Sequence, residues 1–130
     1  MMILGILVGG ALGALSRYGV SVALNAWTAS GPYASFPLGT LVVNVVGSFL
    51  LSFLANAGLA TLLPPAVRVA IGTGFLGAMT TFSTLELETD TLLRGGEAGR
   101  AALYLLATLV LGYLAILLGR VAAAQLAVQR

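Results

Sequence analysis

Long stretches without a charged side chain limit how this chain can fold more than any other feature. The longest uncharged stretches are residues 18–67, 69–85 and 101–119. Charged residues make up 8% of the sequence and hydrophobic residues 59%, whereas a typical soluble domain is about 25% charged. A helix that crosses a membrane needs about 20 mostly apolar residues. The chain is therefore predicted to be an all-α protein that crosses a membrane several times.

Turn-forming residues divide the chain into four predicted membrane-spanning helices in a single domain, 1–130. The predicted helices cover approximately residues 2–27, 36–63, 66–92 and 100–124. Ser30, Gly31 and Pro32 interrupt the first uncharged stretch, and Pro64 and Pro65 end the second helix because proline cannot continue one. A cleavable signal peptide fits the N-terminus poorly, since no basic residue stands at its start.

The amino-acid types that are missing exclude several kinds of site. The sequence has no cysteine and no histidine, so it offers no disulfide, no thiolate metal site and not the commonest proton carrier. No nucleophile lies in a pattern that would pair it with a base, so an enzyme is not expected. The net charge of +2 is too small to indicate nucleic-acid binding.

Glycines at four-residue spacing leave one face of the first predicted helix almost without side chains. They are Gly5, Gly9 and Gly13. Small residues let two helix backbones approach closely inside a membrane. The spacing therefore predicts close packing on this face, either within one chain or between two subunits.

Five small polar residues recur at every fourth position of the second predicted helix. They are Thr40, Asn44, Ser48, Ser52 and Asn56. This spacing keeps the side chains on one slowly rotating face, and polar groups inside a membrane cost free energy unless they have partners. Such residues also join membrane helices by hydrogen bonds. Because five stand in register, we favour a face that lines a path for water or an ion.

The third predicted helix has the most unusual sequence. It carries Gly72, Gly74 and Gly77, followed by hydroxyl side chains at positions 80, 81, 83 and 84. Glycine costs about 1 kcal/mol in a helix interior, and hydroxyls compete for backbone partners. We therefore expect a break near the middle of this helix, with a tightly packed intact helix as the alternative. A broken membrane helix exposes carbonyls that can bind cations and helix ends that can face anions.

The charged residues argue against a proton-coupled carrier, which usually needs a carboxylate within a span. The acidic residues Glu86, Glu88 and Asp90 lie near one end of the third helix. We expect them to be solvated, with Glu86 the best candidate for an exception. Arg17 is the one deeply placed charge, and it can cap carbonyls, bind lipid phosphate or favour an anion.

Neutral hydrogen-bond donors and one arginine suit the passive flow of a small anion. Tyr104 and Thr108, four residues apart, add a weaker polar track on the fourth helix. Fluoride is a strong acceptor, and asparagine amides, hydroxyls and the positive edges of aromatic rings could together replace its hydration shell. Composition alone does not choose fluoride over another anion.

The arginines are spread almost evenly over the two sides of the membrane that this topology predicts. Arg68, Arg120 and Arg130 share the side of both termini, and Arg94 and Arg100 lie on the other. A strong excess of basic residues on one side would fix the orientation. The slight bias leads to the hypothesis that the chain inserts both ways and forms an antiparallel homodimer.

Three motifs stand in order along the chain. They are Gly9-Gly10 with Gly13-Ala14 and Arg17-Tyr18; Gly39-Thr40-Leu41 with Asn44, Gly47-Ser48 and Phe49; and Gly74-Phe75-Leu76-Gly77 followed by Thr80-Thr81-Phe82-Ser83-Thr84. Together they resemble the Fluc/CrcB fluoride channel family along nearly the whole chain. The resemblance implies a passive fluoride channel of the cell (inner) membrane that exports fluoride and relieves its toxicity.

The resemblance also implies a homodimer and a set of site residues. The subunits would be antiparallel, in contact with membrane lipid, with a structural sodium ion at the dimer centre. Backbone carbonyls of Gly77 and Thr80 from both subunits would hold that ion, as suits a hard cation. The implied fluoride pathway contains Asn44, Ser48, Phe82, Ser83, Thr84, Tyr104, Thr108 and Arg17.

Two departures from the family pattern and two other functions complete the sequence-based picture. Leu85 stands where the family usually has a second phenylalanine, and Ala78 replaces the second glycine of its usual pair.

The runner-up function is a small four-helix multidrug or cation exporter, which should carry a carboxylate in its first helix; this chain has none there. A membrane assembly protein without transport would leave the polar face of the second helix without a purpose.

Overall fold

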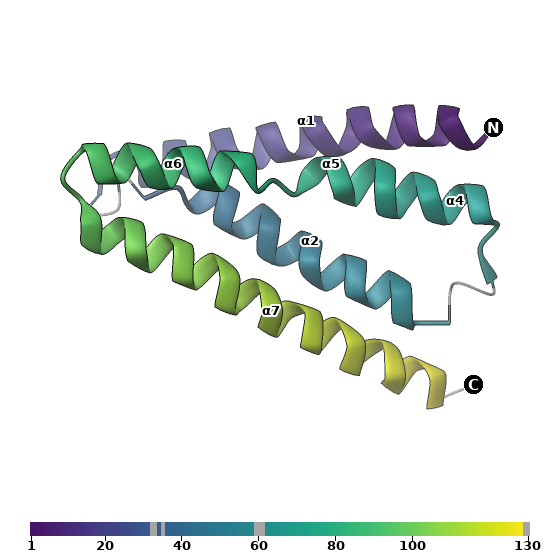
Figure 1. Ribbon diagram of the computed structural model, residues 1–130. Coiled ribbons are helices and arrows are strands. Elements are labelled where there is room, and N and C mark those ends of the chain that lie inside the picture. The colour runs from purple at the N-terminus through teal and green to yellow at the C-terminus, as the bar shows by residue number, and fades with distance from the viewer. Residues whose placement is uncertain (32–33, 35, 59–61, 129–130) are drawn as a thin grey trace.

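Helices make up all the secondary structure in the described part of this computed structural model. The structure describes residues 1–31, 34, 36–58 and 62–128. Its elements are α1 (Met2–Thr28), α2 (Leu38–Asn56), α4 (Pro65–Val69), the π-helix η1 (Ala70–Leu76), α5 (Gly77–Met79), α6 (Ser83–Arg94) and α7 (Ala98–Val128). The chain runs back and forth along the long axis, so α1 begins at the same end of the molecule at which α7 finishes (Figure 1).

Three of these helices, α1, α2 and α7, are long and apolar enough to cross a membrane. The remaining helical segment, residues 65–94, consists of shorter pieces separated by a break and extends alongside α1 (Figure 1). We call it the broken segment. These features confirm an all-α protein with membrane-spanning helices.

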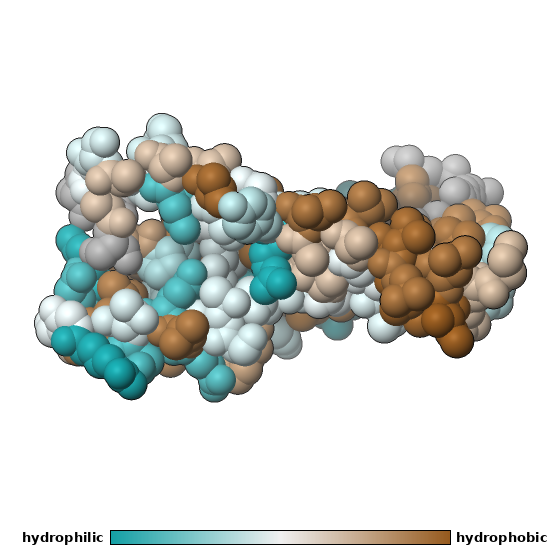
Figure 2. All heavy atoms as spheres, turned by 90° about the horizontal axis from the view of Figure 1, so that it is seen from above, coloured by the Kyte–Doolittle hydropathy of each residue, from teal (hydrophilic) through white to brown (hydrophobic). Residues whose placement is uncertain are grey.

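Polarity differs between the two ends of the molecule. Seen from above α1, hydrophilic side chains gather at the end where α6 turns into α7, and hydrophobic side chains dominate the end where α1 begins (Figure 2). The polar end carries the Asp90–Arg94 and Glu97–Arg100 ion pairs.

Two predicted helix limits need correction. The second helix ends at Asn56 rather than near residue 63, because Gly58 takes a φ of 65°, a left-handed conformation that ends a helix. Residues 59–61 of the predicted helix lie outside the described residues. The fourth helix begins at Ala98 and continues to Val128, so it is longer than expected at both ends.

The predicted break near the middle of the third helix is present, and it lies just after the glycines. Gly72 and Gly74 belong to η1, a wider π-helix of a kind often found at functional sites. The helical path stops at Thr80, whose φ of −84° and ψ of 154° are extended. α6 then begins at Ser83.

The bare face of α1 packs against the broken segment of the same chain. A Cβ atom on Gly9 would lie 2.3 Å from the carbonyl oxygen of Ala70, and one on Gly13 would lie 2.1 Å from that of Phe75. Neither position could hold a side chain without moving backbone. The close packing predicted from the glycine spacing is therefore intramolecular.

A second close contact joins α2 and α7, which run side by side in the same direction (Figure 1). A Cβ atom on Gly119 would lie 2.5 Å from the carbonyl oxygen of Phe49. Beside it, the Ser52 hydroxyl donates a hydrogen bond of 2.7 Å to the carbonyl of Ile116. The molecule thus consists of two tightly joined pairs, and the break lies where the pairs meet.

Candidate functional site

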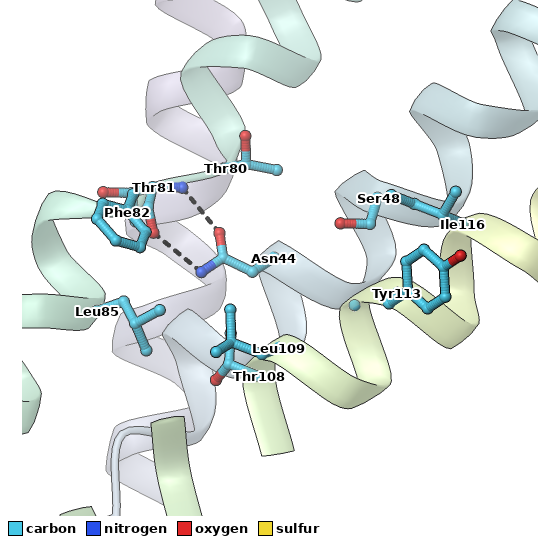
Figure 3. Close-up of a pocket in the computed structure, with 11 residues that line it drawn as sticks. Asn44, Ser48, Thr80, Thr81, Phe82, Leu85, Thr108, Leu109, Tyr113 and Ile116 are labelled. Atoms are coloured by element: carbon cyan, nitrogen blue, oxygen red, sulfur yellow. Dashed lines mark hydrogen bonds between the residues drawn. The ribbon is translucent and has the colours of Figure 1, made fainter. Parts of the chain in front are cut away.

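An open groove lies between α2, α7 and the break after α5. It has a volume of about 360 Å³. Its lining residues are Asn44, Ser48, Thr80, Thr81, Phe82, Leu85, Thr108, Leu109, Gly112, Tyr113 and Ile116. We call it the groove; it brings an amide, several hydroxyls and aromatic rings to the break (Figure 3).

Asn44 joins α2 to the break through both atoms of its amide. Its Oδ1 accepts the Thr81 N–H at 2.8 Å, and its Nδ2 donates to the Thr81 carbonyl at 3.0 Å (Figure 3). The break takes Thr81 out of the helical hydrogen-bond ladder, and the amide replaces both missing partners. Because an amide nitrogen carries two hydrogens, Asn44 keeps one further N–H to offer at the groove.

The start of α6 also faces the groove. The Thr81 hydroxyl accepts the Thr84 N–H at 3.2 Å and donates to the Thr84 hydroxyl at 3.0 Å, which caps this helix. Helix N-termini carry a partial positive charge that favours anions. Phe82, just before the first residue of α6, is 63% exposed and lies at the groove.

Leu85, at the position of the second family phenylalanine, is a core residue. It is 2% exposed and forms a buried cluster with Leu92, Ala101 and Tyr104, while one side of it reaches the groove. Its aliphatic side chain has no polarised ring edge to present to an anion. Phe82 therefore supplies an aromatic edge that Leu85 cannot.

The polar residues of α7 are less available than their sequence suggests. Thr108 is buried, and its hydroxyl donates to the carbonyl of Tyr104 at 2.8 Å. Because its hydrogen is used in this bond, the Thr108 hydroxyl offers the groove only the lone pairs of its oxygen and no hydrogen-bond donor. Gly112 leaves room next to Ser48, since a Cβ there would lie 3.8 Å from the Ser48 hydroxyl oxygen.

A second pocket contains Arg17, which the structure leaves half-buried rather than deeply placed. It has a volume of about 220 Å³ and is lined by Ala14, Arg17, Tyr18, Ser21, Thr40, Thr84 and Glu88. We call it the arginine pocket. It places a guanidinium, a carboxylate and several hydroxyls between α1, α2 and α6.

Glu88, rather than Glu86, is the acidic residue that is drawn into the protein. Its Oε1 accepts the Thr40 hydroxyl at 3.0 Å and its Oε2 accepts the Tyr104 hydroxyl at 2.6 Å. Tyr104 is 0% exposed, whereas Glu86 is exposed. The expectation that Glu86 would be the exception is therefore wrong, because α6 directs position 88 and not position 86 towards α2 and α7.

The predicted pathway residues do not all come together at one site. The groove gathers Asn44, Ser48, Phe82 and Thr108, and the arginine pocket gathers Arg17 and Thr84. Tyr104 is buried and connects to the arginine pocket through Glu88. Ser83 is exposed, with its hydroxyl oxygen 3.4 Å from that of Thr81. Sequence reasoning missed Thr81 and Glu88, whose roles depend on contacts between distant elements.

The polar face of α2 mostly holds the protein together. Thr40 binds Glu88, Asn44 binds Thr81, Ser52 binds the carbonyl of Ile116, and Asn56 donates to the carbonyl of Ser52. Asn44 and Ser48 line the groove. The interpretation of the whole face as the wall of a path was too broad, since its later positions join α2 to α7 or to α2 itself.

Backbone carbonyl oxygens at the break are the candidate ligands for a cation. Within the described ranges, no group of three or more His, Cys, Asp and Glu residues is placed to hold a metal. The Thr81 N–H, which would bond to the Gly77 carbonyl in a continuous helix, is directed to Asn44 instead. This leaves the Gly77 carbonyl without its helical donor, and carbonyl oxygens are suitable ligands for hard cations.

The fold and the groove define a class of small membrane proteins in which a broken helix meets an uncharged groove lined by an amide, hydroxyls and apolar side chains. This chain belongs to the family described as CrcB-like protein, Camphor Resistance (CrcB), whose model matches residues 4–120. The match confirms the family resemblance seen in the sequence motifs.

Relatives from several bacteria share most of the chain. The Fluoride-specific ion channel FluC of Thermus thermophilus is 46% identical over 112 residues, covering 86% of this chain and 85% of the relative. The protein of the same name from Acidobacterium capsulatum is 46% identical over 122 residues, covering 93% and 94%. That from Hydrogenobaculum is 42% identical over 121 residues, covering 92% and 95%.

Proposed function

We propose that this chain is a passive fluoride-selective channel that lets fluoride leave the cell and so relieves its toxicity. Its relatives are fluoride-specific ion channels by name and match it over most of their length. A channel of this family is a transporter and not an enzyme. The observation that carries the proposal is the meeting of Asn44, Phe82 and the start of α6 at one groove.

The groove suits an anion that must leave its hydration shell. The second N–H of Asn44, the Ser48 hydroxyl and the edge of the Phe82 ring present positive charge to it. Among the described residues that line the groove none is charged, so no ion pair holds the anion in place. Many weak donors favour entry while still permitting release, as conduction requires.

The arginine pocket supplies the approach to this passage. We propose that Arg17 raises the local concentration of anions and that the Ser83 and Thr84 hydroxyls help to guide them. The carboxylate of Glu88 occupies the hydroxyls of Thr40 and Tyr104. It thereby limits which donors a passing fluoride can use.

We further propose that the working channel is an antiparallel homodimer in the cell inner membrane, surrounded by lipid. The groove is open on one side, and a second copy of the chain would complete its wall. The nearly even arginine distribution supports insertion in both orientations. A sodium ion between the copies would be held by the Gly77 and Thr80 carbonyls, and its binding would stabilise the assembled state.

A multidrug or cation exporter fits less well. Such a protein would couple export to a carboxylate within its first helix, and α1 carries none. The names of the relatives do not favour it either.

Fluoride efflux from liposomes tests the proposed function directly. Purified protein in vesicles loaded with potassium fluoride should release fluoride, followed by a fluoride electrode, once valinomycin balances the charge. Vesicles loaded with chloride should retain it. Release no faster than from protein-free vesicles, with protein insertion verified, would contradict the proposal.

The site assignment is tested in the same assay. Phe82→Ala removes the ring edge and should slow efflux by about tenfold or more, which corresponds to about 1.4 kcal/mol in the barrier. Trp27→Phe, at a 77% exposed position of α1, is the matched aromatic control. Equal efflux from the Phe82→Ala protein and the control would remove Phe82 from the pathway.

A further inference from the structure

We infer that the Asn44 side chain holds the chain open after α5 and thereby keeps the Gly77 carbonyl available to a cation. Asn44 would thus be a positioning residue for the break in addition to a residue of the groove. The cation half of this inference rests on the sodium site proposed above. The part that concerns the break depends only on the hydrogen bonds of this chain.

The backbone hydrogen bonds stop at the residue that Asn44 binds. The Thr80 N–H still donates to the Leu76 carbonyl at 3.1 Å, four residues earlier, as in a helix. The next bond of that series would join the Thr81 N–H to the Gly77 carbonyl. Instead this N–H donates to Asn44 Oδ1 at 2.8 Å. The ladder therefore ends where the side chain from α2 takes over.

The amide replaces both backbone partners that Thr81 loses. While Oδ1 accepts the Thr81 N–H, Nδ2 donates to the Thr81 carbonyl at 3.0 Å. Unpaired backbone groups are costly in a membrane, so without Asn44 the segment would regain stability by closing the Thr81–Gly77 bond. The Gly77 carbonyl would then be occupied and unable to bind a cation.

The neighbouring turn of α2 supports this arrangement. A Cβ atom on Gly47 would lie 2.3 Å from Cγ2 of Thr80 and 3.2 Å from Cε of Met79. The absence of a side chain at Gly47 lets the extended Thr80 sit against α2, within reach of Asn44. One turn of α2 thus supplies both the space for the break and the amide that holds it.

A single NMR signal can report on this bond. Thr80–Thr81 is the one place in the sequence where two threonines are adjacent. In full-length protein labelled with carbon-13 and nitrogen-15 only at threonine, a labelled carbonyl carbon is therefore bonded to a labelled amide nitrogen at this one position. The single carbonyl-to-amide correlation is that of the Thr81 amide. Its chemical shift should change in Asn44→Ala, because the Thr81 N–H then bonds to the Gly77 carbonyl instead of to Asn44, while its hydrogen exchange stays slow. Ser48→Ala, one turn along the same face, is the matched control and should keep the wild-type chemical shift.

Asn44→Asp provides a second variant that keeps the oxygen acceptor for the Thr81 N–H and loses the donor to the Thr81 carbonyl. It should retain slow exchange at Thr81, so the inference stays testable where Asn44→Ala does not fold. A Thr81 signal with unchanged position in Asn44→Ala, or rapid exchange in folded Asn44→Asp, would overturn the role of Asn44.

Sodium supplies the second readout. Replacing N-methylglucamine by sodium should shift the Thr81 signal in the wild type and in Ser48→Ala, but not in Asn44→Ala. No shift in the wild type, with fluoride efflux intact, would overturn the cation half and leave the channel standing. Normal exchange and sodium responses without fluoride efflux would support the inference and contradict the proposed function.

Discussion

At Asn44 one side chain meets two demands that usually need two residues. Its oxygen and one amide hydrogen satisfy Thr81, and the second hydrogen remains for a ligand in the groove. The rigid hold on Thr81 also fixes the direction of that second hydrogen. An anion therefore meets a donor that is already oriented, with little side-chain entropy left to lose on binding.

Tyr104 is expected to matter for stability through its bond to Glu88. Tyr104→Phe removes a 2.6 Å hydrogen bond to a carboxylate from a fully buried position, and bonds of this charged kind contribute about 1.5–3 kcal/mol. Thermal unfolding in detergent should therefore occur at a lower temperature. Tyr113→Phe, at a 63% exposed position of the same helix, is the control. Equal melting temperatures for the two variants would contradict this role.

Leu85→Phe restores the residue type usual in the family at the cost of core packing. Leu85 is 2% exposed against Tyr104 and Leu92, and a larger side chain in a filled core typically costs about 1–3 kcal/mol. We expect a lower unfolding temperature than for Leu87→Phe, whose position is 66% exposed. A variant as stable as the Leu87→Phe control would show that the core accommodates the second ring.

Several of these residues could be found from sequence, but their partners could not. The spacing along α2 singled out Asn44, and the hydroxyl-rich stretch included Phe82 and Thr84. Glu88 has no local feature that separates it from Glu86. Its distinction arises from hydroxyls on α2 and α7 that only the folded chain brings to it.

At the scale of the elements, the sequence predicted a break near the middle of the third helix, and the structure has one between Met79 and Ser83. The glycines that helped to suggest it, Gly72 and Gly74, are themselves helical. The close fit of η1 against α1 stabilises those glycines in a helical form. The actual break is stabilised by an amide 37 residues earlier in the chain, which no local pattern within the third helix reveals.

The contact between α1 and η1 should depend on the absence of a side chain at Gly13. Gly13→Ala would place a Cβ 2.1 Å from the Phe75 carbonyl oxygen, so the two elements would have to separate. We expect destabilisation of about 1–3 kcal/mol, measured as a lower unfolding temperature in detergent. Gly19→Ala, on the same helix with no atom within 4 Å of the new Cβ, should be neutral or slightly stabilising. If Gly13→Ala melts no lower than Gly19→Ala, the close contact is wrong.

For the whole molecule, composition was enough to establish a membrane protein, but the arrangement of its helices was not predictable from it. The side-by-side pairing of α1 with the broken segment and of α2 with α7 depends on glycine contacts such as that at Gly119. Sequence spacing marks Gly9 and Gly13 on α1 without naming the surface that they meet, and it does not mark Gly119.

The proposed dual topology can be measured on the whole chain. Reporters that work on only one side of the membrane, fused to the C-terminus, should give signal from both sides, because neither end of the molecule has a strong arginine excess. A variant with three arginines added after residue 130 should report from the cytoplasmic side alone. Signal from a single side for the unmodified chain would contradict dual insertion.

The close contact between the glycine face of α1 and the broken segment also affects how the protein is inserted into the membrane during synthesis. The broken segment contains no helix long enough to span a bilayer unaided, and α6 carries three acidic residues. Its backbone, however, fits the face of α1 within van der Waals distance. During synthesis α1 leaves the ribosome first, so it is already present as a template when the weaker segment reaches the translocon. Biogenesis of the interrupted helix is therefore coupled to the first one, and damage to that early helix would appear as failed integration of a later one.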